Sequence, residues 1–160
     1  MKKKISSEIK AQGIQYSGNV KITFKKGDVV LKSETYHNTC TLDMLDLLCL
    51  ALIGQHTDRG AEYMGIGTSN ATDSSLWNIT MHSLVSEKTG CRVKTNIGST
   101  YTKIVNKQAV GKQAVVSATF PYSLIASTSI GELGLFKSRE NDDLLARVVF
   151  PQPVVIGEDD

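Results

Sequence analysis

Two charged residues, Glu132 and Arg147, stand inside apolar segments near the end of the chain. Glu132 interrupts the run 130–136 and Arg147 the run 144–150. A carboxylate in an apolar segment needs a partner to offset its lost hydration, and a guanidinium can bind it through two parallel hydrogen bonds. A role as general acid would require a second catalytic group, and the sequence offers none beside Glu132. We therefore interpret the two residues as a structural ion pair.

Metal binding is not indicated by the histidines and cysteines. His37, His56 and His82 lie in separate segments, whereas a zinc site uses closely spaced ligands. His37 and Cys40 form a single spaced pair without a second one. We expect ordinary surface or turn histidines and no metal.

The segment Gly65-Ile66-Gly67-Thr68-Ser69 is superficially similar to a phosphate-binding turn. It lacks the Gly-Lys-Ser/Thr ending of a P-loop and the three glycines of a dinucleotide site, and no convincing helix follows. We predict a tight turn here and no cofactor. Ser74, Ser75 and Cys91 have no identifiable histidine and carboxylate to activate them as nucleophiles. No catalytic residue is therefore expected.

The polar loop 68–75 and the tryptophan after it are candidates for a contact surface. Loops carry binding function more often than cores, although small polar residues are also the usual composition of any loop. Tryptophan is enriched at interface hot spots, and a core position would suit Trp77 equally well. The candidate interface residues are Trp77, Thr68, Ser69, Asn70 and Asp73.

Strands must position most of these groups. Val20, Ile22 and Phe24 alternate with polar residues, which predicts a half-buried strand, and the run 29–36 is its partner in a first hairpin. Further strands are predicted at 62–66, 91–105, 109–120, 130–136 and 144–151, with a turn at 137–143. The segment 76–87 is ambiguous between a short helix and a connector.

One long helix is predicted over residues 41–53. Thr39 or Thr41 can cap its start, and Gly54 ends it. Because its apolar residues, Cys49 included, cover nearly all faces, we expect a buried helix that packs on the sheet or is shared with a neighbouring subunit. With no repeated β–helix–β unit, the fold class is mainly β: an antiparallel β-sandwich with one buried α-helix.

Bulk properties favour one ordinary globular domain of 160 residues. The formal net charge of +2 is too small to indicate a nucleic-acid partner, and no run reaches the roughly 18 apolar residues of a membrane span. The start shows no apolar signal-peptide core, so we expect a cytoplasmic product. We predict a flexible arm at 1–12, a domain at 13–157 and an acidic end at 158–160.

The final hairpin also carries a resemblance. The segments Glu132-Leu133-Gly134-Leu135-Phe136 and Leu144-Leu145-Ala146-Arg147, with Phe150-Pro151, resemble a recurring module of tailed-bacteriophage tail, baseplate and fibre-attachment proteins. The order of segments is similar too, with a Gly-Ile-Gly-Thr stretch after the helix, then Glu87 and Arg92, and the likeness spans 13–157. The Glu87–Arg92 spacing is looser than in that family, which normally adds another strand after the proline-rich turn. That strand is absent here, is donated by another chain, or lies in a longer polypeptide.

The resemblance implies a non-enzymatic virion structural protein of the tail, baseplate, fibre-attachment or neck region. Its partners would be other virion structural proteins, with a homo-oligomer or ring, no nucleic acid and no membrane. It would be assembled in the host bacterial cytoplasm and reside in the virion. The alternative is a carbohydrate- or receptor-binding module of a tail fibre, although aromatic residues are only 6% of the chain. A hydrolase, the third class, lacks an assembled set of catalytic groups.

Overall fold

The computed structural model describes residues 18–26, 28–55, 60–70, 81–105 and 108–155. The predicted arm at 1–12, the acidic end at 158–160, and His56, Asp73 and Trp77 lie outside these residues. In chain order the elements are β1 (Gly18–Lys26), β2 (Val29–Cys40), α1 (Leu42–Leu52), β3 (Tyr63–Gly67), β4 (Val93–Lys94), β5 (Asn96–Val105), β6 (Gln108–Ser117), α2 (Tyr122–Ile125), β7 (Ser129–Phe136) and β8 (Leu144–Val155).

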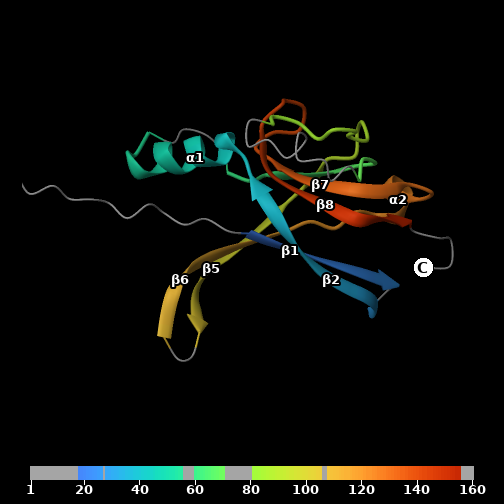
Figure 1. Ribbon diagram of the computed structural model, residues 1–160, viewed down its shortest axis with the longest axis horizontal. Helices are drawn as coiled ribbons and strands as arrows, with labels where there is room; N and C mark the ends of the chain where they lie inside the picture. Colours follow the sequence, from blue (N-terminus) through green and yellow to red (C-terminus); the bar gives the residue numbers. More distant parts are fainter. Residues whose placement is uncertain (1–17, 27, 56–59, 71–80, 106–107, 156–160) are drawn as a thin grey trace, which may run out of the picture.

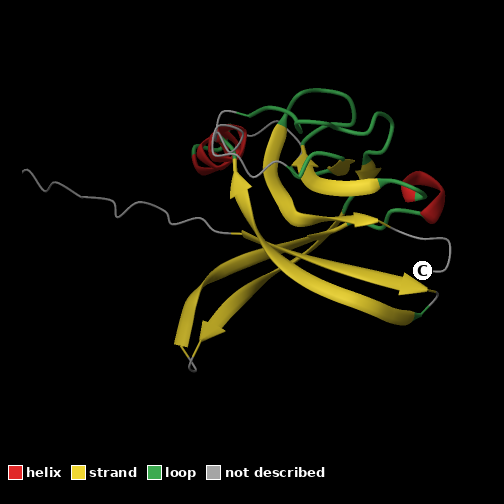
Figure 2. Cartoon of the chain, turned by 45° about the vertical axis from the view of Figure 1, so that its right-hand side comes forward, coloured by secondary structure: helices red, strands yellow, loops and turns green. Residues whose placement is uncertain are grey.

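The central hairpin β7–β8 organises a six-stranded antiparallel sheet in the order β1-β2-β8-β7-β3-β4. Strand β2 pairs with β8 only near its end, through Thr39↔Arg147 and Cys40↔Ala146. Most of the β1–β2 hairpin is therefore free to project from the sheet, as does the separate two-stranded hairpin β5–β6 (Figures 1 and 2).

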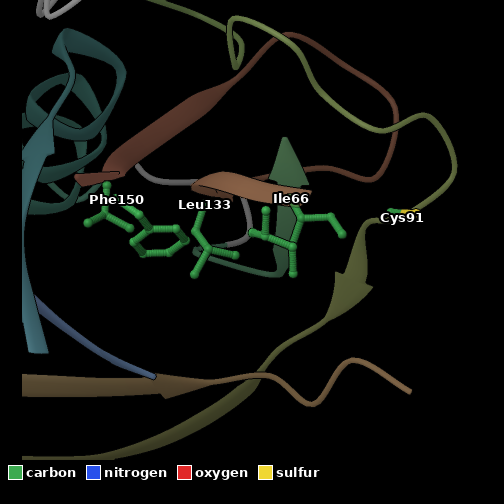
Figure 3. Close-up of a cluster of buried hydrophobic side chains, with 6 residues drawn as sticks. Ile66, Cys91, Leu133 and Phe150 are labelled. Carbon is green, nitrogen blue, oxygen red and sulfur yellow. The ribbon is translucent and has the colours of Figure 1, made fainter. Parts of the chain in front are cut away.

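The main core lies on one face of the central strands. Figure 3 shows Ile66, Leu133 and Phe150 side by side, and each is no more than 9% exposed. The base of the projecting β1–β2 hairpin curls over this layer, because the ring of Tyr36 lies 4.9 Å from that of Phe150 between centroids. Other partly buried apolar residues packed against the layer include Val20, Ile22, Phe120, Leu124 and Ile125.

The opposite face is covered by an irregular segment, residues 81–92, which we call the strap. Leu84 of the strap packs with Phe136 and Leu144 of the sheet in a second apolar cluster. The strap is held to the sheet edge by backbone bonds, Lys88 N–H to the Ile66 carbonyl at 2.9 Å and Leu144 N–H to the His82 carbonyl at 2.9 Å. The strap thus occupies the place that a second sheet would take in a sandwich.

The predicted buried helix is exposed instead. Met44 is its one buried side chain among those described, whereas Leu42, Leu45, Leu50 and Cys49 face solvent. Helix α1 attaches to the sheet at its start, where Thr41 N–H donates to the Leu145 carbonyl at 3.0 Å, and no other described segment covers the four exposed side chains.

The predicted threonine cap of α1 is also wrong for Thr41, which holds the capping position without a capping hydrogen bond. Its hydroxyl donates to the carbonyls of Leu144 and Leu145 instead. This side chain therefore anchors the helix start to β8, and Thr39 lies within β2.

The mainly β, antiparallel fold is confirmed, and the sandwich is not: the described strands form one curled sheet and a separate hairpin. The predicted strand 91–105 is interrupted at Thr95, whose N–H and hydroxyl donate to the carbonyls of Glu62 and Ala61. A four-residue helix, α2, was not predicted. No helix within the described ranges is long and apolar enough to cross a bilayer.

Candidate functional site

The ion-pair residues lie on the strap side of the sheet, at positions that the register brings together. Glu132 lies opposite Gly67 of β3, and Gly134 lies opposite Gly65 of β3 and Arg147 of β8. Directly opposed residues of antiparallel strands share a face, so Glu132 and Arg147 are diagonal neighbours on it. The glycines leave room on this face for the two long charged side chains.

Gly65 and Gly67 are strand residues, so the predicted tight turn at 65–69 is wrong. A Cβ at Gly67 would lie 2.4 Å from Glu132 Oε1 and 2.8 Å from the Ser86 carbonyl oxygen. Strand glycines often mark such close approaches. Packing around Glu132, rather than a turn or a bound phosphate, accounts for this glycine.

Glu132 is fully buried and receives three hydrogen bonds. Arg147 Nε donates to Oε2 at 2.6 Å, the Ser86 N–H to Oε1 at 2.8 Å and the Val85 N–H to Oε2 at 3.3 Å. Charge-assisted bonds of this kind are roughly twice as strong as neutral ones. The carboxylate therefore joins β8 and the strap through a single side chain.

A second ion pair lies within the strap, and its arginine also holds the strap to the turn after β7. Arg92 Nε and Nη2 donate to the two carboxylate oxygens of Glu87 at 2.6 and 2.9 Å. Its Nη1 donates to the carbonyls of Ser138 and Asn141, and the guanidinium carbon lies 3.5 Å from the Phe136 ring centroid. The sequence analysis noted Glu87 and Arg92 without predicting their contact. Their opposite charges on either side of Gly90 were the available signal.

Lys88 makes a third polar connection that the sequence analysis missed. Its ammonium donates to the Leu124 carbonyl at 2.9 Å and to the Thr128 hydroxyl. The strap is therefore joined to the α2 region as well. A lone lysine between charged and small residues carries no pattern that distinguishes this position from a solvated one.

These three connections suit a structural role better than a chemical one. Glu132 has no exposed surface, so a substrate cannot reach its carboxylate in this conformation. Among the described residues no group of three or more His, Cys, Asp or Glu side chains could hold a metal ion. His37 is exposed on β2, and His82 Nδ1 contacts Asp43 Oδ2 at 2.8 Å. The contacts of Glu132, Arg92 and Lys88 hold the strap and the central hairpin β7–β8 in one geometry.

The candidate interface loop is described only in part. Thr68 and Asn70 are exposed and Ser69 is half-buried. The Ser69 carbonyl group lies against Gly131, where a Cβ would come within 2.5 Å of it. The base of this loop therefore packs closely on β7, and its two outward side chains remain accessible.

Exposed apolar side chains gather at two other places. The first, the helix patch, consists of Leu42, Leu45, Leu50 and Ile53 on and after α1, each between 38% and 65% exposed. The second, the tip patch, consists of Val29, Val30 and Leu31 at the far end of the β1–β2 hairpin, between 47% and 65% exposed, with Val29 and Leu31 on one face of the hairpin and Val30 on the other. Contiguous exposed apolar residues mark interaction sites more often than single ones do.

The β1–β2 hairpin also carries the perturbed titrating groups. The Tyr36 hydroxyl donates to Glu34 Oε2 at 2.7 Å, and Lys32 Nζ lies 3.0 Å from Glu34 Oε1. Burial, followed by this hydrogen bond, raises the pKa of Tyr36 to about 12. The hydrogen bond from Tyr36, followed by that from Lys32, lowers the pKa of Glu34.

Comparison with known proteins adds no family to this description. No protein-family model matches the chain, and no curated protein or solved structure matches it.

Proposed function

We propose that this chain is a non-enzymatic structural subunit of a tailed-phage virion, in the tail, baseplate, fibre-attachment or neck region. It works by assembly: a fixed body presents surfaces to neighbouring subunits. The order of the Gly-Ile-Gly-Thr segment and the final Glu132–Arg147 hairpin in the sequence suggests the phage context.

The observation that carries the proposal is the amount of apolar surface left on the projecting elements. Burying a leucine or valine side chain contributes about 1.5–3 kcal/mol, and the seven residues of the helix patch and the tip patch forgo much of this in a single chain. A subunit that completes its core against neighbours recovers that energy on assembly. This favours an assembly role over that of an isolated soluble enzyme.

The buried polar network supports the same role. Breaking or forming a buried ion pair is costly, so such pairs favour one geometry over others more than they add stability. Glu132 and Arg92 together fix the strap, the turn 137–143 and β8. A subunit of a repeating assembly needs such a fixed frame, because small errors in each copy accumulate.

The carbohydrate-binding alternative has no specific observation in its favour. Trp77, the aromatic residue on which it rests, lies outside the described residues. Loss of glycan binding on Trp77→Ala would be needed to revive it.

A nonsense codon early in the reading frame tests the proposal in the phage that encodes the chain. Without a suppressor, we expect particles that lack an appendage in negatively stained micrographs and do not infect. Complementation by the full chain restores both properties. Intact, infectious virions made without the chain would overturn the proposal.

A further inference from the structure

We infer that the helix patch of one copy binds the tip patch of a second copy of this chain, in a head-to-tail contact. This inference rests on the proposed assembly function and specifies its partner: the same polypeptide. It names two different surfaces that meet, rather than one surface that meets itself.

The two patches lie far apart on one molecule. Helix α1 and the far end of the β1–β2 hairpin lie on opposite sides of the molecule in two views (Figures 1 and 2). A single copy therefore cannot bring Leu45 against Val30. Each patch remains exposed after folding, and the tip patch lies at the end of the β1–β2 hairpin, which projects from the sheet.

Charge complementarity identifies the second copy as the occupant. Helix α1 contains Asp43 and Asp46 and no lysine or arginine, and its last turn has no cation. Asp43 Oδ2 lies 2.8 Å from His82 Nδ1, so the negative charge beside the helix patch comes from the exposed Asp46 and from the helix C-terminus, which carries about half a negative charge. Residues 21–34 of the β1–β2 hairpin hold four lysines against Asp28 and Glu34. Lys32 pairs with Glu34, and Lys25 is exposed on the strand position opposite Val30. Apolar contact at the centre and opposite charges at the rim are the usual anatomy of a specific interface.

A contact between two different patches is heterologous. It repeats from copy to copy and closes into a ring if the rotation per copy divides a full turn. A helix-to-helix contact would instead be self-complementary and stop at a dimer. The two arrangements therefore predict different masses and different responses to mutation.

Mixing two defective variants tests the inference by light scattering on the full chain. Leu45→Asp spoils the helix patch, and Val30→Asp spoils the tip patch. We expect the unchanged chain to form a species larger than a dimer and each variant alone to fall to the 17.4 kDa monomer. An equimolar mixture should give a species of twice that mass, because the intact helix patch of Val30→Asp can bind the intact tip patch of Leu45→Asp.

Val115→Asp is the matched control, since Val115 on β6 is 42% exposed, as Leu45 is at 43%, and belongs to neither patch. It should assemble like the unchanged chain, and circular dichroism melting should show all three variants folded. Assembly retained by Val30→Asp but lost by Leu45→Asp would mean a helix-to-helix contact and would overturn the inference. A monomer at every concentration would also overturn it, while leaving the nonsense-codon test of the proposed function to stand or fall alone.

Charge exchange tests the choice of partner. Asp46→Lys and Lys25→Glu should each lower the apparent association constant at low salt, about two- to fivefold. The variant carrying both changes should regain most of it, because each contact again joins opposite charges. Failure of the double variant to recover would contradict the charge pairing between copies.

Discussion

The carboxylate of Glu132 shows how one side chain can hold three parts of the molecule. It is buried, binds Arg147 of β8 and accepts the N–H groups of Val85 and Ser86 in the strap. Removing its charge would leave the Arg147 guanidinium buried opposite a neutral group. Because breaking a buried pair costs more than the pair contributes, the effect of one substitution should be large.

We predict that Glu132→Gln lowers the free energy of unfolding by about 3–5 kcal/mol, measured by urea denaturation. Combining it with Arg147→Met should recover part of the loss, since the glutamine oxygen still accepts from Ser86 and no buried charge remains. Glu34→Gln, which breaks the exposed pair with Lys32, is the control and should shift the urea midpoint much less. Equal shifts for Glu132→Gln and Glu34→Gln would refute the buried-pair account.

The raised pKa of Tyr36 predicts that the folded chain loses stability in alkali. Because its pKa in the folded chain is raised from 10 to about 12, its protonated form is favoured by folding. The associated stability is fully present below pH 10 and is lost as the pH rises through about 12. Tyr36→Phe lacks this component, so its urea midpoint should fall less steeply than that of the unchanged chain between pH 10 and 12. Parallel pH profiles would show that Tyr36 does not titrate differently on folding.

At the scale of elements, strands β3 and β7 are kept close to the strap by glycines. A Cβ at Gly134 would lie within 3.0 Å of atoms of Phe136, Leu144 and Leu84, and Gly67 is as crowded by Glu132 and Ser86. The strap can lie on this face only because these side chains are missing. Gly67 and Gly134 therefore mark the positions at which the strap passes closest to the sheet.

We predict that Gly67→Ala lowers the free energy of unfolding by about 1–3 kcal/mol through overpacking. It should also raise hydrogen exchange at Val85 and Ser86, whose N–H groups would lose their carboxylate partner. Gly60→Ala is the matched control, because nothing lies within 4 Å of a Cβ there. An unchanged exchange rate at Ser86 in Gly67→Ala would contradict this packing.

The sequence predicted the local elements better than their arrangement. Alternation and turn residues placed the strands and the turn 137–143 well, because these signals act between neighbours in the chain. The predicted burial of α1 was wrong, because the sequence of an apolar helix does not distinguish a face covered by its own chain from a face left exposed for another chain. The path of the strap was not predicted: residues 76–87 are ambiguous in sequence because they have no clear periodicity, and residues 91 and 92 were wrongly placed in a strand. The contacts of the strap with Glu132 and with the turn 137–143 join positions distant in the chain.

At the scale of the whole molecule, a body contains the core and two hairpins project from it. The body contains the core around Ile66, Leu133 and Phe150 and the fixed polar network. The hairpins β1–β2 and β5–β6 extend from it in different directions, and α1 lies beside it (Figures 1 and 2). Projecting elements with apolar surface are liabilities for an isolated protein, and contact surfaces for a subunit.

The most direct test of the assembly account is quantification of the chain in purified virions. On the proposed virion role a phage encodes the chain, and its particles would be separated on a density gradient and analysed by quantitative mass spectrometry and immunogold labelling. The account predicts that the chain sediments with the particles at a fixed copy number and that label gathers at one place in the tail region. A chain that stays in the soluble fraction, with unlabelled and complete virions, would contradict it.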